Sequence, residues 1–149
     1  MAITADYLPT DAGLRNPSDY TPELSRRARG IDVWAALRSL GRRGVEELIV
    51  RCCAHARRFA AGLQAGGYEI LNDVVLNQVL VSFGDDDTTQ RVIEEIQRDG
   101  TCWCGGTIWQ GRRAMRISVC NWSTTQDDVD QSLDAIIRIA KSEVVDEGQ

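Results

Sequence analysis

Residues 114–120 alternate between apolar and small or polar side chains, and an arginine lies on the face opposite the apolar one. Successive side chains of a strand point to opposite faces. Met115, Ile117 and Val119 therefore share one face and can enter a core together. Arg116 falls on the other face among small residues, where a long cation has room to reach outward. The alternation alone leaves open which group Arg116 meets.

Cysteines and one histidine are the other residues that could carry chemistry. Cys52, Cys53 and His55 fall in one helical pattern, and Cys102 and Cys104 stand two residues apart in a later segment. Consecutive helical residues point about 100° apart, so the adjacent pair cannot easily chelate one ion. We therefore expect buried thiols rather than a metal site. We expect His55 at the surface, on the polar margin of its helix.

The hydrophobic pattern predicts the elements that must position these residues. Apolar residues at steps of three and four predict a long helix over 43–65, after a short helix over 31–41 that ends at Gly41. After residue 67 the apolar residues alternate with a period of two in the predicted strands and return to helical spacing in the predicted helices. It predicts strands at 68–73 and 77–84, a helix at 85–100, two strands within 101–121 joined at Gln110-Gly111, and a helix that starts at Thr124 or Thr125.

Strands that follow each other closely indicate an α+β fold, in which helices pack on one face of a small antiparallel sheet. The second face of that sheet is expected to be uncovered. Trp34 and Trp103 are expected in the core. The other predicted core residues are Leu48, Phe59, Val81, Ile117, Leu133 and Ile137.

The chain divides by pattern into three predicted parts. Residues 1–29 hold all three prolines and no sustained period, which predicts an extended arm. Residues 30–66 form a helical connector, and residues 67–149 form the α+β small domain. A free-standing domain seldom begins with so long an unpatterned arm, so the arm suggests a neighbouring domain.

Composition narrows the function classes. The 149 residues carry a net charge of −5, which argues against a general nucleic-acid binder. No apolar run approaches the roughly 20 residues of a membrane helix, and the first residues lack the features of a signal peptide. Five cysteines are an odd number, so we expect reduced thiols and a cytoplasmic protein.

Two groups of segments resemble a known family. YTPELSRRARGIDVWAALRSLGRRGVEELIVRCCAHARRFA is similar to the region after the active site of group II pyridoxal-phosphate-dependent amino-acid decarboxylases. These enzymes include the aromatic-amino-acid, histidine, glutamate and diaminobutyrate types. LNDVVLNQVLVSF and AMRISVCNWSTTQDDVDQSLDAI resemble the small C-terminal domain of the same fold type I enzymes. The resemblance covers nearly the whole chain.

The resemblance implies a carboxy-lyase of amino-acid metabolism that uses pyridoxal 5′-phosphate and works as a homodimer. In the family, a large domain holds the cofactor on the lysine of a His-Lys pair, which precedes a Tyr-Leu pair. That Tyr-Leu pair corresponds here to Tyr7-Leu8, and the one lysine of the chain is Lys141, in the last predicted helix. The chain therefore resembles a C-terminal fragment without the Schiff-base lysine. We expect it to hold no covalent cofactor and to be inactive alone.

Residue roles follow from the same resemblance. The family tyrosine at the position of Tyr7 lies on a mobile loop and donates a proton after carbon dioxide leaves; Tyr20 is a weaker candidate. Arg116 corresponds to an arginine that contacts the substrate carboxylate in glutamate-type members and supports packing in aromatic-type members. Arg26, Arg27 and Arg29 are expected to face the large domain or the second subunit, or else solvent.

A different class of function fits the residues as well. Small antiparallel sheets with helices on one face occur in many regulatory domains, and a fold does not determine a function. The alternative is an independent α+β module that binds a ligand or partner without catalysis.

Overall fold

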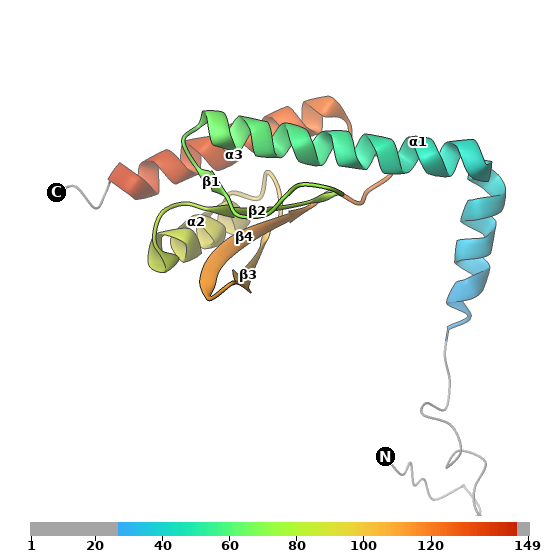
Figure 1. The fold of residues 1–149 in the computed structure, drawn as a ribbon, viewed down its shortest axis with the longest axis horizontal. Helices are drawn as coiled ribbons and strands as arrows, with labels where there is room; N and C mark the ends of the chain where they lie inside the picture. Colours follow the sequence, from blue (N-terminus) through green and yellow to red (C-terminus); the bar gives the residue numbers. More distant parts are fainter. Residues whose placement is uncertain (1–26, 146–149) are drawn as a thin grey trace, which may run out of the picture. The chain divides into compact units, whose positions relative to one another are not determined.

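The computed structural model describes residues 27–145, which divide between Ser39 and Leu40 into two units. The order of helices and strands agrees with the predicted order (Figure 1). Among the described residues, none of the helices combines the length and apolar character that a membrane span needs. The elements are α1 (Arg29–Ala65), β1 (Glu69–Ile70), β2 (Gln78–Ser82), α2 (Asp86–Asp99), β3 (Gly105–Trp109), β4 (Arg112–Ser118) and α3 (Gln126–Val145).

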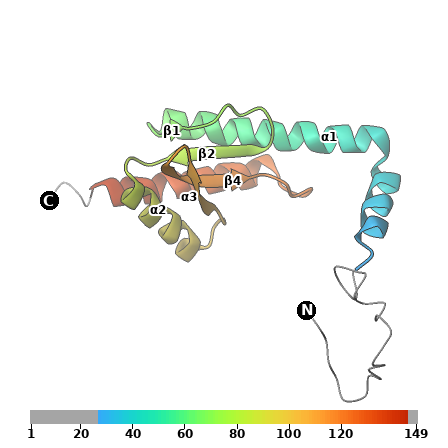
Figure 2. The same cartoon turned by 60° about the horizontal axis from the view of Figure 1, so that its bottom comes forward.

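Helix α1 is interrupted at the predicted glycine. Gly41 has φ 63° and ψ −178°, which is not a helical conformation and which favours glycine. In the segment that follows, the buried side chains begin at Cys52 and continue to Leu63. The prediction that Leu48 joins the core is wrong, because Leu48 is half-buried and Ile49 is 52% exposed. Figures 1 and 2 show the first turns of this segment extending past the end of the sheet, so nothing in the sheet covers them.

The four strands form one antiparallel sheet in the order β1-β2-β4-β3. The central pair, β2 and β4, aligns Val79 with Ile117 and Val81 with Met115. The hairpin between β3 and β4 turns at Gln110 and Gly111, which have φ values of 49° and 81°. Two residues with positive φ are typical of the turn that fits the twist of paired strands.

The core lies between one sheet face and the helices. Helices α1 and α3 pack side by side, and a Cβ at Gly62 would lie 2.9 Å from the Leu133 side chain (Figures 1 and 2). Ile137 is half-buried against the core. The predicted core residues Phe59, Val81, Ile117 and Leu133 are buried, which confirms the α+β prediction.

Local signals account for the helix ends. Asp85 caps α2 by accepting a hydrogen bond from the Thr88 amide at 2.7 Å, and Gly100 ends the helix in the left-handed conformation. Thr125 and Asp128 cap α3 reciprocally, since each side chain accepts a hydrogen bond from the other residue's amide. The prediction of a threonine cap is confirmed, at Thr125.

Two tryptophans expected in the core are on the surface. Trp34 is 64% exposed and Trp103 is 75% exposed. Trp103 stands between Cys102 and Cys104, which turn inward, and alternation therefore directs the tryptophan outward.

Candidate functional site

Arg116 lies in the middle of β4 on the sheet face opposite the helices. Its register partners are Leu80 of β2 and Gly105 of β3. A Cβ at Gly105 would meet no atom within 4 Å, so the space beside Arg116 is open. Arg116 is exposed, and it makes no hydrogen bond or ion pair with any described residue. Its guanidinium is therefore available to a group from outside residues 27–145.

A second arginine on the same face is already paired. Arg112 donates hydrogen bonds from Nη2 and Nη1 to the two carboxylate oxygens of Glu69, at 2.7 Å and 3.2 Å. The hydrogen bond from Arg112 lowers the pKa of Glu69. The pair lies at the end of the face where Ser82 and Ala114 are buried. Arg116 is thus left as the uncompensated cation of this face among the described residues.

The second face is only partly open. Leu80, Ser82 and Ala114 are buried there, whereas Arg116 and Ser118 are exposed. The expectation of an uncovered second face therefore holds at the end of β4 that carries Arg116 and not along its whole length. An unpaired guanidinium beside a small-residue gap can bind a planar anion such as a carboxylate through two hydrogen bonds.

Tyr7, the other predicted site residue, lies outside the described residues, as do Tyr20 and Arg26. Arg27 forms a 2.6 Å ion pair with Asp32 in the first unit. The proton-donor role of Tyr7 stays a prediction.

His55 is not the surface residue that the sequence predicted. It is 9% exposed, and its Nε2 lies 3.2 Å from the backbone oxygen of Thr124. Arg51, one turn earlier in α1, donates a hydrogen bond of 2.8 Å to the oxygen of Trp122. The two side chains hold the loop between β4 and α3 onto α1, an arrangement that helical spacing alone does not indicate.

The expectation of buried thiols holds for three of the five cysteines. Cys52, Cys53 and Cys104 are buried, Cys102 is half-buried and Cys120 is exposed. Within residues 27–145, no three histidine, cysteine or acidic side chains converge as metal ligands would. A cavity of about 210 Å³ lies beside Cys102, Cys104 and Cys120.

Lys141 is exposed on α3. A lysine that forms a Schiff base at neutral pH needs desolvation or a neighbouring cation. The exposed side chain of Lys141 is not desolvated in this way.

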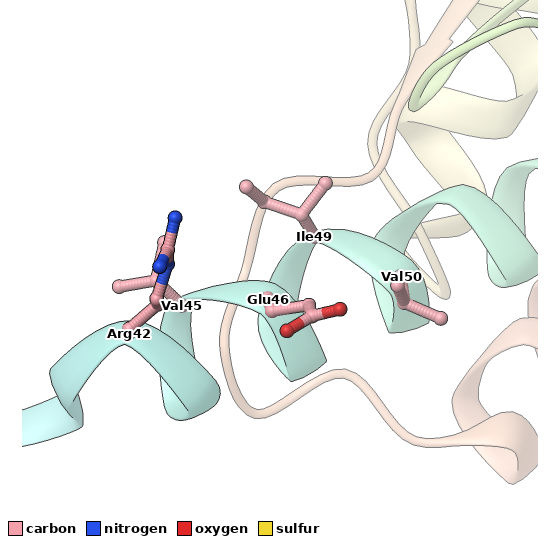
Figure 3. Close-up of a pocket in the computed structure, with 5 residues that line it drawn as sticks. All are labelled: Arg42, Val45, Glu46, Ile49 and Val50. Carbon is pink, nitrogen blue, oxygen red and sulfur yellow. The ribbon is translucent and has the colours of Figure 1, made fainter.

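An apolar surface lies on the first turns of α1 that extend past the sheet. Figure 3 shows a hollow of about 490 Å³ lined by Arg42, Val45, Glu46, Ile49 and Val50. All five side chains come from one helix, so the hollow is an open surface rather than an enclosed site. Ile49 and Val50 are 52% and 60% exposed.

Comparisons with known proteins identify similar enzymes. No known family profile matches the chain. Histidine decarboxylase of Drosophila melanogaster is 29% identical over 108 residues, which cover 71% of this chain and 13% of that protein.

Solved structures have the same fold at low sequence identity. TDC of Oryza sativa, solved with PLP and tryptamine, has a TM-score of 0.72 and 18% identity, over 85% of this chain and 29% of that chain. A second structure is the glutamate decarboxylase domain of diaminobutyrate-pyruvate transaminase and L-2,4-diaminobutyrate decarboxylase from Vibrio parahaemolyticus. It has a TM-score of 0.65 and 20% identity, over 78% of this chain and 27% of that chain.

The similarity is confined to one part of these enzymes. The chain spans less than a third of each of these proteins, and the matching region is their C-terminal part. The predicted resemblance to group II pyridoxal-phosphate-dependent decarboxylases is confirmed, as is the likeness to the small domain of fold type I enzymes.

Proposed function

We propose that this chain is the C-terminal small domain of a pyridoxal-phosphate-dependent amino-acid decarboxylase, a carboxy-lyase. The observation that carries the proposal is the extent of the likeness: 85% of this chain has the fold of the C-terminal part of one such enzyme. The sequence similarity to histidine decarboxylase over 108 residues supports the same assignment.

The cofactor belongs, in this proposal, to a large domain outside the described residues. Pyridoxal 5′-phosphate supplies the electron sink that decarboxylation of an amino acid requires. Because Lys141 is exposed, we assign the Schiff-base lysine to the large domain. The 149 residues alone are then expected to be inactive.

Two surfaces of the chain suit the large domain and a second subunit. The apolar surface of Val45, Ile49 and Val50 is of the kind that a neighbouring domain covers. The open end of the second sheet face, with Arg116, suits the side that borders the active site. Tyr7 is proposed as the proton donor that acts after carbon dioxide leaves.

Arg116 is proposed to contact the carboxylate of the substrate side chain. Its guanidinium has no partner among the described residues, and Gly105 leaves space beside it. In this proposal the substrate is an acidic amino acid. Structural support of the site is the other role that the family resemblance allows. It predicts equal KM changes for acidic and aromatic substrates when Arg116 is replaced.

The experiment compares variants of the complete enzyme that contains this chain. Arg116→Lys keeps the charge and loses the planar two-point contact, so KM for glutamate should rise by roughly 10- to 150-fold, which corresponds to 1.5–3 kcal/mol for a hydrogen bond to a charged group. KM for histidine or tryptophan should change little. Arg112→Lys is the matched control, because Arg112 already pairs with Glu69 within the chain.

Three results would count against this account. Equal KM changes for acidic and aromatic substrates would assign Arg116 a supporting role. Unchanged kinetics in Arg116→Ala would remove Arg116 from the site. A complete protein that releases no carbon dioxide from any amino acid in the presence of pyridoxal 5′-phosphate would contradict the decarboxylase proposal and favour the independent binding module.

A further inference from the structure

Cys102 and Cys104 form a thiol pair that the proposed decarboxylase function does not use. They flank Trp103 in the segment that leads into β3. Cys104 is 4% exposed and belongs to the core, and Cys102 is half-buried against it. Residues two apart that both turn inward bring their thiols to the same side of the segment.

The surrounding structure holds the pair in place. Gln97 of α2 donates a hydrogen bond of 2.8 Å from Nε2 to the backbone oxygen of Cys104. Ser132 of α3 lines the same cavity as the two cysteines. Helices α2 and α3 therefore both border the segment that carries the pair.

A small oxidant can reach the pair. Both cysteines line a cavity of about 210 Å³, and Cys120 lies on the wall of the same cavity. The cavity is large enough for several water molecules. Because Trp103 is 75% exposed, the short segment that carries the thiols lies at the molecular surface.

The two thiols differ in the pKa that their surroundings give them. The neighbouring Cys104 thiol and, to a lesser extent, Ser132 lower the pKa of Cys102, although burial and the nearby Asp99 carboxylate oppose them. The same contact and burial raise the pKa of Cys104. Cys102 is consequently the thiol of the pair that loses its proton more readily, and a thiolate is the reactive form of cysteine.

We propose that Cys102 and Cys104 are a dithiol modification site that a hydroperoxide converts to an internal disulfide. The Cys102 thiolate attacks one peroxide oxygen, the O–O bond breaks, and Cys102 becomes a sulfenic acid while an alcohol or water leaves. Cys104 then loses its proton and attacks the Cys102 sulfur; the S–S bond forms and water leaves. Two thiols together give two electrons to one hydroperoxide.

The spacing permits this bond, and the chain contains an internal control. Residues two apart are separated by at most about 7 Å between Cα atoms, and a bend between them reaches the roughly 4.4–6.8 Å that a disulfide needs. The backbone bends at Cys102. Cys52 and Cys53 are also neighbours, but both lie in α1, where their side chains point about 100° apart.

The test treats the purified 149-residue chain with hydrogen peroxide at one equivalent, alkylates the remaining thiols under denaturing conditions and digests with trypsin. Cleavage after arginine separates the cysteines into peptides 52–57, 99–112 and 117–138. Peptide 99–112 should lose two hydrogens and take up no alkyl group, and dithiothreitol should restore two alkylation sites. Peptide 52–57 should remain doubly alkylated.

Variants decide which sulfur atoms react. Cys120→Ser should leave the oxidised peptide 99–112 unchanged, because Cys120 is exposed and lies outside the short segment that carries the pair. Cys104→Ser should convert the product into a sulfenic acid on Cys102 that dimedone traps. The proposal is overturned if peptide 99–112 stays doubly alkylated, if peptide 52–57 oxidises first, or if the disulfide joins 99–112 to 117–138.

Discussion

Arg116 and Ile117 are neighbours in β4 with opposite surroundings. Ile117 is 6% exposed and packs in the core opposite Val79. Arg116 is exposed and makes no hydrogen bond or ion pair with the described residues. The two residues therefore have different roles: Ile117 stabilises the fold, and Arg116 remains available for binding.

Substitution of the two residues should therefore give unequal losses of stability. Ile117→Ala removes buried methyl groups and leaves a cavity, which should lower the free energy of unfolding by about 2–5 kcal/mol. Arg116→Ala removes an exposed side chain and should change it by no more than about 0.5 kcal/mol. Urea unfolding of the 149-residue chain measures both values. Equal losses would mean that the two faces of β4 have been assigned incorrectly.

Alternation predicted the β4 side chains correctly because a strand has only two faces. Met115, Ile117 and Val119 are buried, and Arg116 is exposed. The sequence did not predict that Arg116 faces Gly105, because register between strands is decided by the whole sheet. His55 was misassigned for a similar reason, since its partner, Thr124, is 69 positions away in the chain.

At the scale of elements, helices α1 and α3 are joined by an ion pair as well as by the core. Arg58 donates to both carboxylate oxygens of Asp130, with Nη2 to Oδ2 at 2.7 Å. The hydrogen bond from Arg58 lowers the pKa of Asp130 below its ordinary value of 3.8. Because the folded carboxyl holds its proton less tightly than the unfolded one, the pair stabilises the fold fully above that ordinary value.

The stabilisation should disappear as the pH falls through the lowered pKa of Asp130. We expect the free energy of unfolding to decline below about pH 4, and Asp130→Asn to make that decline shallower. Asp134→Asn is the matched control, because Asp134 lies one turn further along α3 and has no hydrogen bond or ion pair among the described residues. Urea titrations between pH 2.5 and pH 7 provide the comparison. Identical slopes in the two variants would contradict a role for the Arg58–Asp130 pair.

Helix and strand positions were more predictable than their packing. Helical spacing and capping residues located α2 and α3 closely, because Asp85, Gly100 and Thr125 act within their own segments. The same spacing placed Leu48 in the core incorrectly. An apolar stripe indicates which side of a helix can be buried. How much of that side is buried depends on how far the sheet extends along the helix.

At the scale of the whole molecule, several large apolar side chains lie outside the core and are exposed. Val45, Ile49 and Val50 lie on an open hollow of α1 (Figure 3), and Trp122 is 75% exposed on the loop before α3. The chain matches less than a third of the enzymes that it resembles. Both facts agree with the proposal that a large cofactor-binding domain covers part of this surface.

Borohydride reduction of the native protein tests the central claim most directly. An antibody against residues 40–145 captures the protein from its source cells, sodium borohydride fixes any Schiff base, and mass spectrometry locates the pyridoxyl group. We predict a polypeptide much longer than 149 residues with the pyridoxyl group on a lysine outside this sequence. A pyridoxyl group on Lys141, or a captured protein of 16.5 kDa without any pyridoxyl lysine, would contradict the account.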